Sequence, residues 1–373
     1  MRFNISSKTL MSHLSAVSKV VNSKNTITIL DNFLFDLKGE ELVITASDSE
    51  TTLKTRIIVN EAEGEGKFAV NAKRLNELLK ELPEQGLKFE IDDNNLEINI
   101  YYMNGKFNFV GINGNEFPQK ALNDSDSRTF AIPAKEIVKG INQTIFAVGT
   151  EDLRPVMMGI LWDVKPEHII FVATDTRKLV RYTDGTSQPG QTCSFILPVK
   201  GATVLKNVFG REESIDVTLS KTAVLFRSAS FTFCCRLIKG NFPDYNRVIP
   251  QSNPYVLTVD RQSFLTSVRR VAVFGNEGGG LVKFKFTPDT VRLSAADNNF
   301  GTSGWESVPC SYTGPEMMMG FSSMFLTEIL STFNCSEVEI KIADPSRPAL
   351  CVPADNDPLT ELLMILMPMN ISE

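Results

Sequence analysis

The side chains that most often carry chemistry are few in this sequence. Only two histidines are present, His13 and His168, which does not support a histidine-based triad or a multi-histidine metal site. The cysteines have neither the regular spacing of a disulfide framework nor a C-x-x-C pair, so we interpret them as free, buried thiols and expect no metal site. They are Cys193, Cys234, Cys235, Cys310, Cys335 and Cys351.

Two further patterns could suggest chemistry. The run Gly278-Gly279-Gly280 lacks the spacing of a phosphate-binding loop and is typical of a flexible turn. Asp48, Asp175 and Asp297 each follow an apolar strand pattern, where aspartate is expected to form a turn. We therefore expect neither catalysis nor a bound cofactor.

Length and composition narrow the class of protein. The chain has 373 residues, of which 42% are hydrophobic, enough for two or three domains of about 100–200 residues each. It has no apolar leader and no run near the roughly 18 apolar residues of a membrane span, so we expect a cytoplasmic protein. The net charge of −6 argues against nucleic-acid binding unless the charges are segregated.

An internal threefold repeat organises the chain. Amphipathic helix patterns that include Leu10, Ile137 and Phe264 keep one spacing of 127 residues. In each copy a strand that ends in aspartate, a second helix and strands of period two follow. The sequence thus predicts an α+β fold of three repeated domains, each with two helices packed on one face of antiparallel β-sheet. The predicted domains are 1–122, 129–250 and 254–373, with linkers near 119–128 and 249–255.

The charges divide between the predicted helices and the rest of the chain. The helical segments 7–21, 71–82, 133–148, 198–210, 260–274 and 322–334 together carry +7, which leaves −13 for the remainder of a chain of net −6. A basic helical surface can hold duplex DNA through diffuse, sequence-independent attraction to phosphates. The alternative is that these cations only solvate exposed helix faces.

Several motifs resemble those of one family along nearly the whole chain. They lie at 26–32 (TITILDN), 154–159 (RPVMMG), 174–179 (TDTRKL), 242–248 (FPDYNRV) and 367–369 (MPM). With these motifs the sequence resembles the bacterial β sliding clamps, the processivity subunits of DNA polymerase III. The resemblance implies the DNA clamp fold, closed into a ring by a head-to-tail homodimer that encircles duplex DNA.

The resemblance also implies three sets of functional residues. For the dimer interface these are Phe107, Phe109, Val273 and Phe274, and for DNA binding Lys24, Lys73, Lys80, Arg154, Lys200 and Lys206. A pocket would capture short linear peptides of the polymerase III catalytic subunit, the clamp loader and repair polymerases. It would comprise Met157, Thr174, Arg177, Leu179, Pro243, Arg247, Val248, Phe325, Ile365, Leu366, Met367, Pro368 and Met369.

Alternatives stay open on the residues alone. A protein-interaction scaffold that does not encircle DNA would use the same repeats and the same methionine-rich pocket. For Leu366 and Met367, the alternative is that a terminal apolar run simply completes a sheet. Val156 stands where many relatives have tyrosine and Ser322 where a polar amide is common, which bears on peptide preference.

Overall fold

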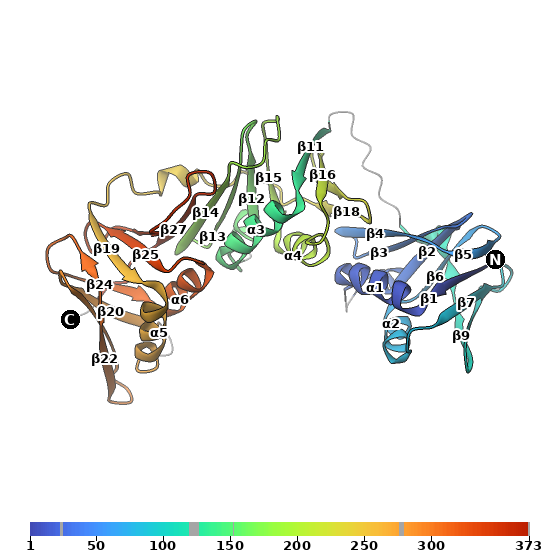
Figure 1. The fold of residues 1–373 in the computed structure, drawn as a ribbon, viewed down its shortest axis with the longest axis horizontal. Coiled ribbons are helices and arrows are strands. Elements are labelled where there is room, and N and C mark those ends of the chain that lie inside the picture. The colour runs from blue at the N-terminus through green and yellow to red at the C-terminus, as the bar shows by residue number, and fades with distance from the viewer. Residues whose placement is uncertain (23–24, 119–126, 152, 276–279, 372–373) are drawn as a thin grey trace. The chain divides into compact units, whose positions relative to one another are not determined.

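The computed structural model describes residues 1–22, 25–118, 127–151, 153–275 and 280–371 (Figure 1). Lys24, Gly278, Gly279 and most of the predicted linker at 119–128 lie outside these residues. The chain packs as two compact units, one of Met1–Val138 with Lys200–Leu237 and one of Lys139–Val199 with Ile238–Glu373.

The first unit contains two antiparallel sheets, ordered β5-β1-β7-β8-β9 and β10-β6-β2-β3-β4-β18-β17-β16-β11. Helices α1 (Ser7–Val17) and α2 (Ala72–Glu81) pack against each other and against the second sheet, and α4 is Val199–Val208. The strands are β1 (Arg2–Ser6), β2 (Asn32–Lys38), β3 (Glu41–Ser47), β4 (Thr51–Ile58), β5 (Asn60–Glu63), β6 (Gly66–Asn71), β7 (Gly86–Ile91), β8 (Glu97–Tyr102), β9 (Gly105–Val110), β10 (Ile112–Asn113), β11 (Arg128–Pro133), β16 (Ser214–Leu219), β17 (Ala223–Arg227) and β18 (Phe231–Arg236).

The second unit also contains two antiparallel sheets, ordered β15-β12-β13-β14-β27-β26-β25-β19-β23 and β22-β21-β20-β24. Helices α5 (Arg261–Ala272) and α6 (Ser323–Thr332) pack together, and the residues of α3 (Ala134–Thr144) from 139 onward belong to this unit. The strands are β12 (Gly159–Val164), β13 (Ile169–Thr174), β14 (Lys178–Asp184), β15 (Cys193–Pro198), β19 (Tyr255–Asp260), β20 (Leu281–Phe286), β21 (Thr290–Asp297), β22 (Thr302–Pro309), β23 (Ser311–Tyr312), β24 (Met317–Ser322), β25 (Glu337–Ile342), β26 (Ala349–Pro353) and β27 (Leu362–Leu366).

Each nine-stranded sheet joins two repeats through one strand pair. In the first unit β4 pairs with β18 and sets Leu53 opposite Phe233. In the second unit β14 pairs with β27 and sets Val180 opposite Met364. The strands of each repeat therefore divide between two sheets, a feature that the sequence pattern did not predict because local periodicity carries no information on pairing partners.

The helices begin where the sequence places a capping side chain. The side chains of Ser6, Asn71, Asp260 and Ser322 accept hydrogen bonds from backbone N–H groups three residues later, which satisfies donors left free in a first helical turn. Helix α1 ends at Val17, earlier than predicted, and continues as a 3-10 turn over Ser18–Val20. Such tightening is common at helix ends.

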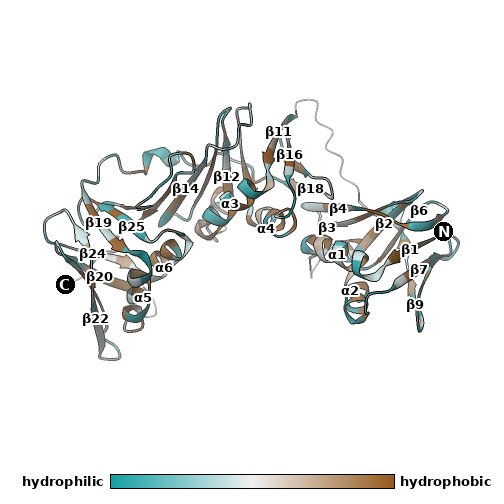
Figure 2. Cartoon of the chain, in the orientation of Figure 1, coloured by the Kyte–Doolittle hydropathy of each residue, from teal (hydrophilic) through white to brown (hydrophobic). Residues whose placement is uncertain are grey.

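Alternating strands and amphipathic helices bury the apolar residues, as the brown and teal faces in Figure 2 indicate. In β7, for example, Leu87, Phe89 and Ile91 are buried while Lys88 between them is exposed. The repeated aspartates form turns as predicted, since one carboxylate oxygen each of Asp48, Asp175 and Asp297 accepts from backbone N–H groups two and three residues later.

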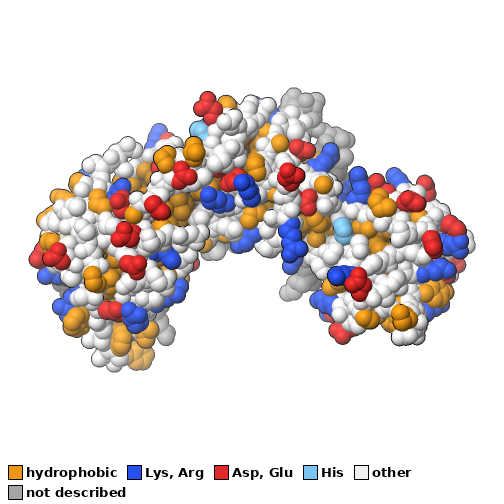
Figure 3. Space-filling view, in the orientation of Figure 1, with side chains coloured by type: hydrophobic (Ala, Val, Ile, Leu, Met, Phe, Trp, Pro, Cys, Tyr) orange, Lys and Arg blue, Asp and Glu red, His pale blue; other side chains and the backbone are white. Residues whose placement is uncertain are grey.

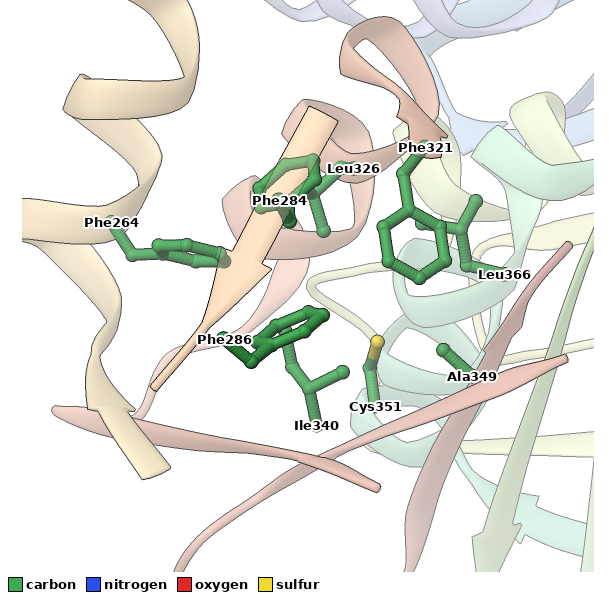
Figure 4. Close-up of a pocket in the computed structure, with 9 residues that line it drawn as sticks. All are labelled: Phe264, Phe284, Phe286, Phe321, Leu326, Ile340, Ala349, Cys351 and Leu366. Carbon is green, nitrogen blue, oxygen red and sulfur yellow. The ribbon is translucent and has the colours of Figure 1, made fainter. Parts of the chain in front are cut away.

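The core of the third repeat retains a cavity of only about 10 Å³ (Figure 4). Its walls are apolar and come from α5, α6 and the strands of both sheets, including Phe264, Phe284, Phe321, Cys351 and Leu366. A space this small and apolar does not hold an ordered water, so we interpret it as a packing gap. No helix in the described part of the chain is long and apolar enough to cross a membrane.

Candidate functional sites

The first candidate site is the basic surface of α2 in the first unit. Leu75 and Leu79 are buried, which leaves Lys73 and Lys80 exposed on the opposite side of the helix. Lys73 Nζ lies 4.0 Å from a carboxylate oxygen of Glu77 one turn later, a distance typical of a weak surface pair. Both predicted lysines thus project from a helix whose other side is anchored in the core.

Helix α4 presents Lys206 and Lys200 differently. Lys206 is exposed, whereas Lys200 Nζ donates to a carboxylate oxygen of Asp48 and, at 3.1 Å, to the carbonyl of Val20. Burial acts to raise the pKa of Asp48, but the hydrogen bonds from Lys200 and Thr51 outweigh it and leave that pKa below its usual value. Lys200 therefore ties α4 to the first repeat. Figure 3 shows Lys and Arg side chains in blue over the region of α4.

The remaining predicted DNA-binding residues are Arg154 and Lys24. Arg154 is exposed in the second unit, directly before the 3-10 turn Pro155–Met157, and its carbonyl accepts from the N–H of Met157 at 2.9 Å. Lys24 lies outside the described residues.

The second candidate site is an apolar cluster in the second unit, at the joint of β14 and β27. Leu179 and Ile365 are register partners and both belong to the cluster. Phe242 and Ile249 of the segment after β18 pack against it, as does Val156. This joint combines strand ends of the second repeat with the last strand of the third.

The segment 242–249, which links the second repeat to the third, packs on one side of this cluster. The Tyr245 hydroxyl donates to a carboxylate oxygen of Asp163 at 2.9 Å, and burial together with that carboxylate raises the pKa of Tyr245 to about 12. Pro243 precedes this tyrosine, and Val248 and Arg247 follow it with exposed side chains. The side chain of Arg247 is 85% exposed, with Nε 3.0 Å from Asp244. Tyr245, which was absent from the predicted set, thus fixes the segment that carries three of its members.

The chain after β27 completes the other side. The N–H of Met367 donates to the Arg177 carbonyl at 2.9 Å, and that of Met369 to the Gly320 carbonyl at 2.8 Å. Met367 is exposed and Pro368 half-buried. The structure thus places the segment 367–369 beside the start of β14 and beside Gly320 of β24.

Leu366 does not join the other predicted pocket residues. It lies on the opposite face of β27 from Ile365 and lines the core cavity of the third repeat, because successive strand side chains point to opposite faces. Thr174 is buried and its hydroxyl donates to the Lys178 carbonyl at 2.7 Å. Met157 is half-buried next to these strands, with its carbonyl accepting from Gly149.

One cation missing from the predicted set lies under the joint. Lys178 Nζ, in a side chain only 5% exposed, is 2.9 Å from Asp175 and 3.0 Å from Glu328 of α6. It also lies 4.2 Å from the ring centre of the half-buried Phe325. A buried cation is tolerated when carboxylates pair with it. The predicted pocket includes the neighbouring Arg177 but not Lys178, because a sequence does not show whether a lysine is buried.

The predicted interface residues lie at two open sheet edges. Phe107 and Phe109 are half-buried on β9, the edge of the five-stranded sheet, and Phe107 stacks on Tyr102 with ring centres 4.7 Å apart. In the second unit Val273 and Phe274 are exposed after α5, beside the edge strand β22. A Cβ atom on Gly304 of β22 would lie 2.4 Å from Phe274, so the ring covers this glycine.

The three repeats share one order of helices and strands, and each nine-stranded sheet joins two of them edge to edge. This arrangement defines the class of three-domain clamp folds. The chain belongs to the DNA polymerase III beta subunit family. Models of its N-terminal, central and C-terminal domains match residues 1–122, 131–244 and 246–369.

Relatives and solved structures match this chain over nearly its full length. The chain is similar to the beta sliding clamp of Staphylococcus aureus, with 26% identity over 374 residues and 98% of each chain covered, and to that of Bacillus subtilis, with 25% identity over 375 residues that cover 98% and 99%. It is similar to the DnaN sliding clamp from Pseudomonas aeruginosa bound to griselimycin (TM-score 0.94, 25% identity, all of both chains). The beta subunit from Streptococcus pyogenes has a TM-score of 0.93 at 19% identity over all of both chains, which concerns the fold alone.

Proposed function

We propose that this protein is a DNA sliding clamp, which encircles duplex DNA without sequence specificity and tethers the replicative polymerase and other replication and repair proteins to it. The observation that carries the proposal is the repeated joint between strands. Its two internal copies imply a third joint, made with a second copy of the chain. The proposed role is non-catalytic. We also propose that the three domains span residues 1–122, 129–250 and 254–373.

Strand order supports closure by a head-to-tail dimer. Strands β4, β14 and β22 occupy the same place in their repeats, as do β18, β27 and β9. The pairs β4–β18 and β14–β27 are made within the chain, which leaves β22 and β9 as open edges. An open edge offers unpaired backbone groups to another strand, and a heterologous contact that closes produces a ring. We infer that β22 pairs with β9 of the partner subunit.

Register predicts which side chains would meet at this seam. Leu53, Val180 and Gly304 are equivalent, because each pairs with the alanine two residues before the repeated aspartate. Leu53 and Val180 have Phe233 and Met364 as partners across the joint. The same comparison of registers places Phe107 of the partner subunit opposite Gly304. Phe274, which fills the space over this glycine, would then pack against that phenylalanine.

Charge supports duplex DNA as the ligand. Lys73, Lys80 and Lys206 are exposed on helices, and the helical segments are the basic part of a chain of net −6. Diffuse contacts of this kind weaken as salt rises and allow sliding. Lys200 contributes less in this proposal, because its ammonium group already binds Asp48.

The apolar joint of β14 and β27 is the proposed site for the partners' short linear peptides. The buried Leu179 and Ile365 form its apolar floor, the exposed Met367 supplies an adaptable wall, and Arg247 supplies a cation at the rim. Flexible methionine surfaces can repack around related peptides, as a shared docking site requires. In this proposal Leu366 supports the site from the core and does not contact the peptide.

Retention on DNA of different topology tests the proposal. A clamp loaded onto nicked circular plasmid stays bound during gel filtration at high salt and slides off once the plasmid is linearised. The alternative, a scaffold that does not encircle DNA, predicts equal loss from both templates. The decisive comparison uses one loaded sample divided between cut and uncut plasmid.

A further inference from the structure

The outer face of the four-stranded sheet in the third repeat is hollowed and carries cations beside exposed apolar side chains. Lys283, Lys285, Arg292 and Trp305 line the hollow, together with Met318 and small residues. Trp305 is 62% and Met318 47% exposed. Exposed apolar side chains that share one hollow often mark a binding surface.

The equivalent faces of the other two repeats are covered by the chain itself. In each repeat the residue just before the second helix pairs with a residue of the neighbouring strand, namely Asn32, Gly159 or Leu281. Two residues farther along that strand stand Leu34, Leu161 and Lys283, which are therefore equivalent positions. Phe117 packs on Leu34, and Phe242 belongs to the cover over Leu161. In both repeats, therefore, an extended segment after the last strand lays an aromatic ring on this face. In the third repeat the segment after β27 meets the face at Gly320, where Met369 and Ile371 lie, while Trp305 and Met318 stay exposed.

The third repeat has changed the chemistry of this face. Two positions farther along the strand, Asp36 and Asp163 have Lys285 as their counterpart. The two aspartates bind a lysine and a tyrosine hydroxyl, Lys67 and Tyr245. A lysine here would instead bind a carboxylate. The change from apolar and acidic to basic therefore alters which kind of segment the face can accept.

The aromatic part of the hollow is preorganised. The guanidinium carbon of Arg292 lies 3.9 Å from the ring centre of Trp305. An arginine stacked in this way keeps its N–H edge available to a carboxylate, while the tryptophan holds it in place. Lys285 Nζ is 3.4 Å from Glu316 at the border of the face, a distance that a competing carboxylate could match.

We propose that this face is a second docking site for proteins, separate from the joint of β14 and β27, and that it binds an extended acidic segment with one aromatic or apolar anchor. The carboxylates of the segment pair with Lys283, Lys285 and Arg292, and the anchor rests on Trp305 and Met318. Peptide is favoured over single-stranded nucleic acid because polypeptide occupies the equivalent faces of the other repeats. The site does not depend on encircled DNA.

A fluorescein-labelled peptide, Glu-Asp-Gly-Asn-Phe-Pro-Asp-Glu-Asp, tests the proposal on the full-length protein at low salt. We expect saturable binding by fluorescence anisotropy, and a change in tryptophan emission that Trp305→Phe removes. Of the two tryptophans, Trp162 is fully buried, so Trp305 is the reporter. Lys285→Asp, which restores the residue type of the other repeats, should weaken binding about tenfold.

Matched controls decide the outcome. Lys38→Asp makes the same charge change at an exposed site of the first repeat and should leave the affinity unchanged. The same peptide with every acidic residue replaced by its amide should bind at least about tenfold more weakly. No saturation by about 1 mM peptide, or equal affinity for Lys285→Asp, would overturn the proposal. So would binding of a thymidine oligonucleotide in place of the peptide.

Discussion

Replacement of Phe274 by glutamate is predicted to break the ring into single subunits. Phe274 is 40% exposed in the isolated chain, and a phenylalanine buries about 150–250 Å² in all. Covering the exposed part at the proposed seam removes on the order of 80 Å² from water, worth about 2 kcal/mol at roughly 25 cal/mol per Å². A head-to-tail dimer has two seams. Loss of this contact at both costs about 4 kcal/mol, or about a thousandfold in the dimer dissociation constant.

Sedimentation velocity across a range of protein concentrations measures this change. Phe274→Ala isolates the apolar contact and should show the calculated weakening, whereas Phe274→Glu adds the cost of a buried charge and should sediment as a monomer. Leu359→Ala, also at an exposed apolar residue of the second unit, is the control and should remain dimeric. If Phe274→Glu keeps the dimer mass with an unchanged melting temperature, the inferred pairing of β22 with β9 is wrong.

Three further predictions concern the peptide site, the joint of the first two repeats and the core thiols. Arg247→Ala should weaken a labelled clamp-binding peptide of the polymerase about three- to tenfold, measured by anisotropy with the dimer mass unchanged; unaltered affinity would remove this arginine from the site. Asp48→Asn should lower the free energy of unfolding by about 1–3 kcal/mol at pH 7, because Lys200 loses a charged partner. The pKa of Asp48 is lowered in the folded state, so its stabilising effect is present above pH 3.8, the ordinary pKa of the carboxyl, and is lost as the pH falls through the lower pKa of the folded protein. The melting temperatures of the two proteins should therefore converge in acid. A difference that persists there would refute the ion pair as the cause. Cys351 and Cys235 are buried, and burial raises the pKa of each thiol to about 12, so at pH 8 a thiol reagent should modify them only after denaturant unfolding, as measured by mass spectrometry; rapid labelling of the native protein would contradict the packing described for the two cores.

Local features of the sequence were predicted correctly where they depend on near neighbours. The six helices and the turn-forming aspartates follow from apolar spacing and from side chains such as Ser6 and Asn71, which cap the helix that they precede. The prediction of free thiols buried in the core applies fully to Cys235 and Cys351, whereas the other four cysteines are half-buried. Periodicity identifies the buried face of an element but not how deeply each residue lies within it.

The sequence by itself determined the threefold repeat, the segregation of positive charge to the helices and the membership of a family, because each of these is written in residue types and their spacing. Only the tertiary structure decided how strands of different repeats pair. That pairing places Lys200 on Asp48 and encloses Lys178 between two carboxylates. It also turns Leu366 into the core of the third repeat, while Ile365 enters the apolar cluster on the other face of β27. The physical reason is that pairing and burial depend on contacts between residues far apart in the chain, whose energies no local pattern records.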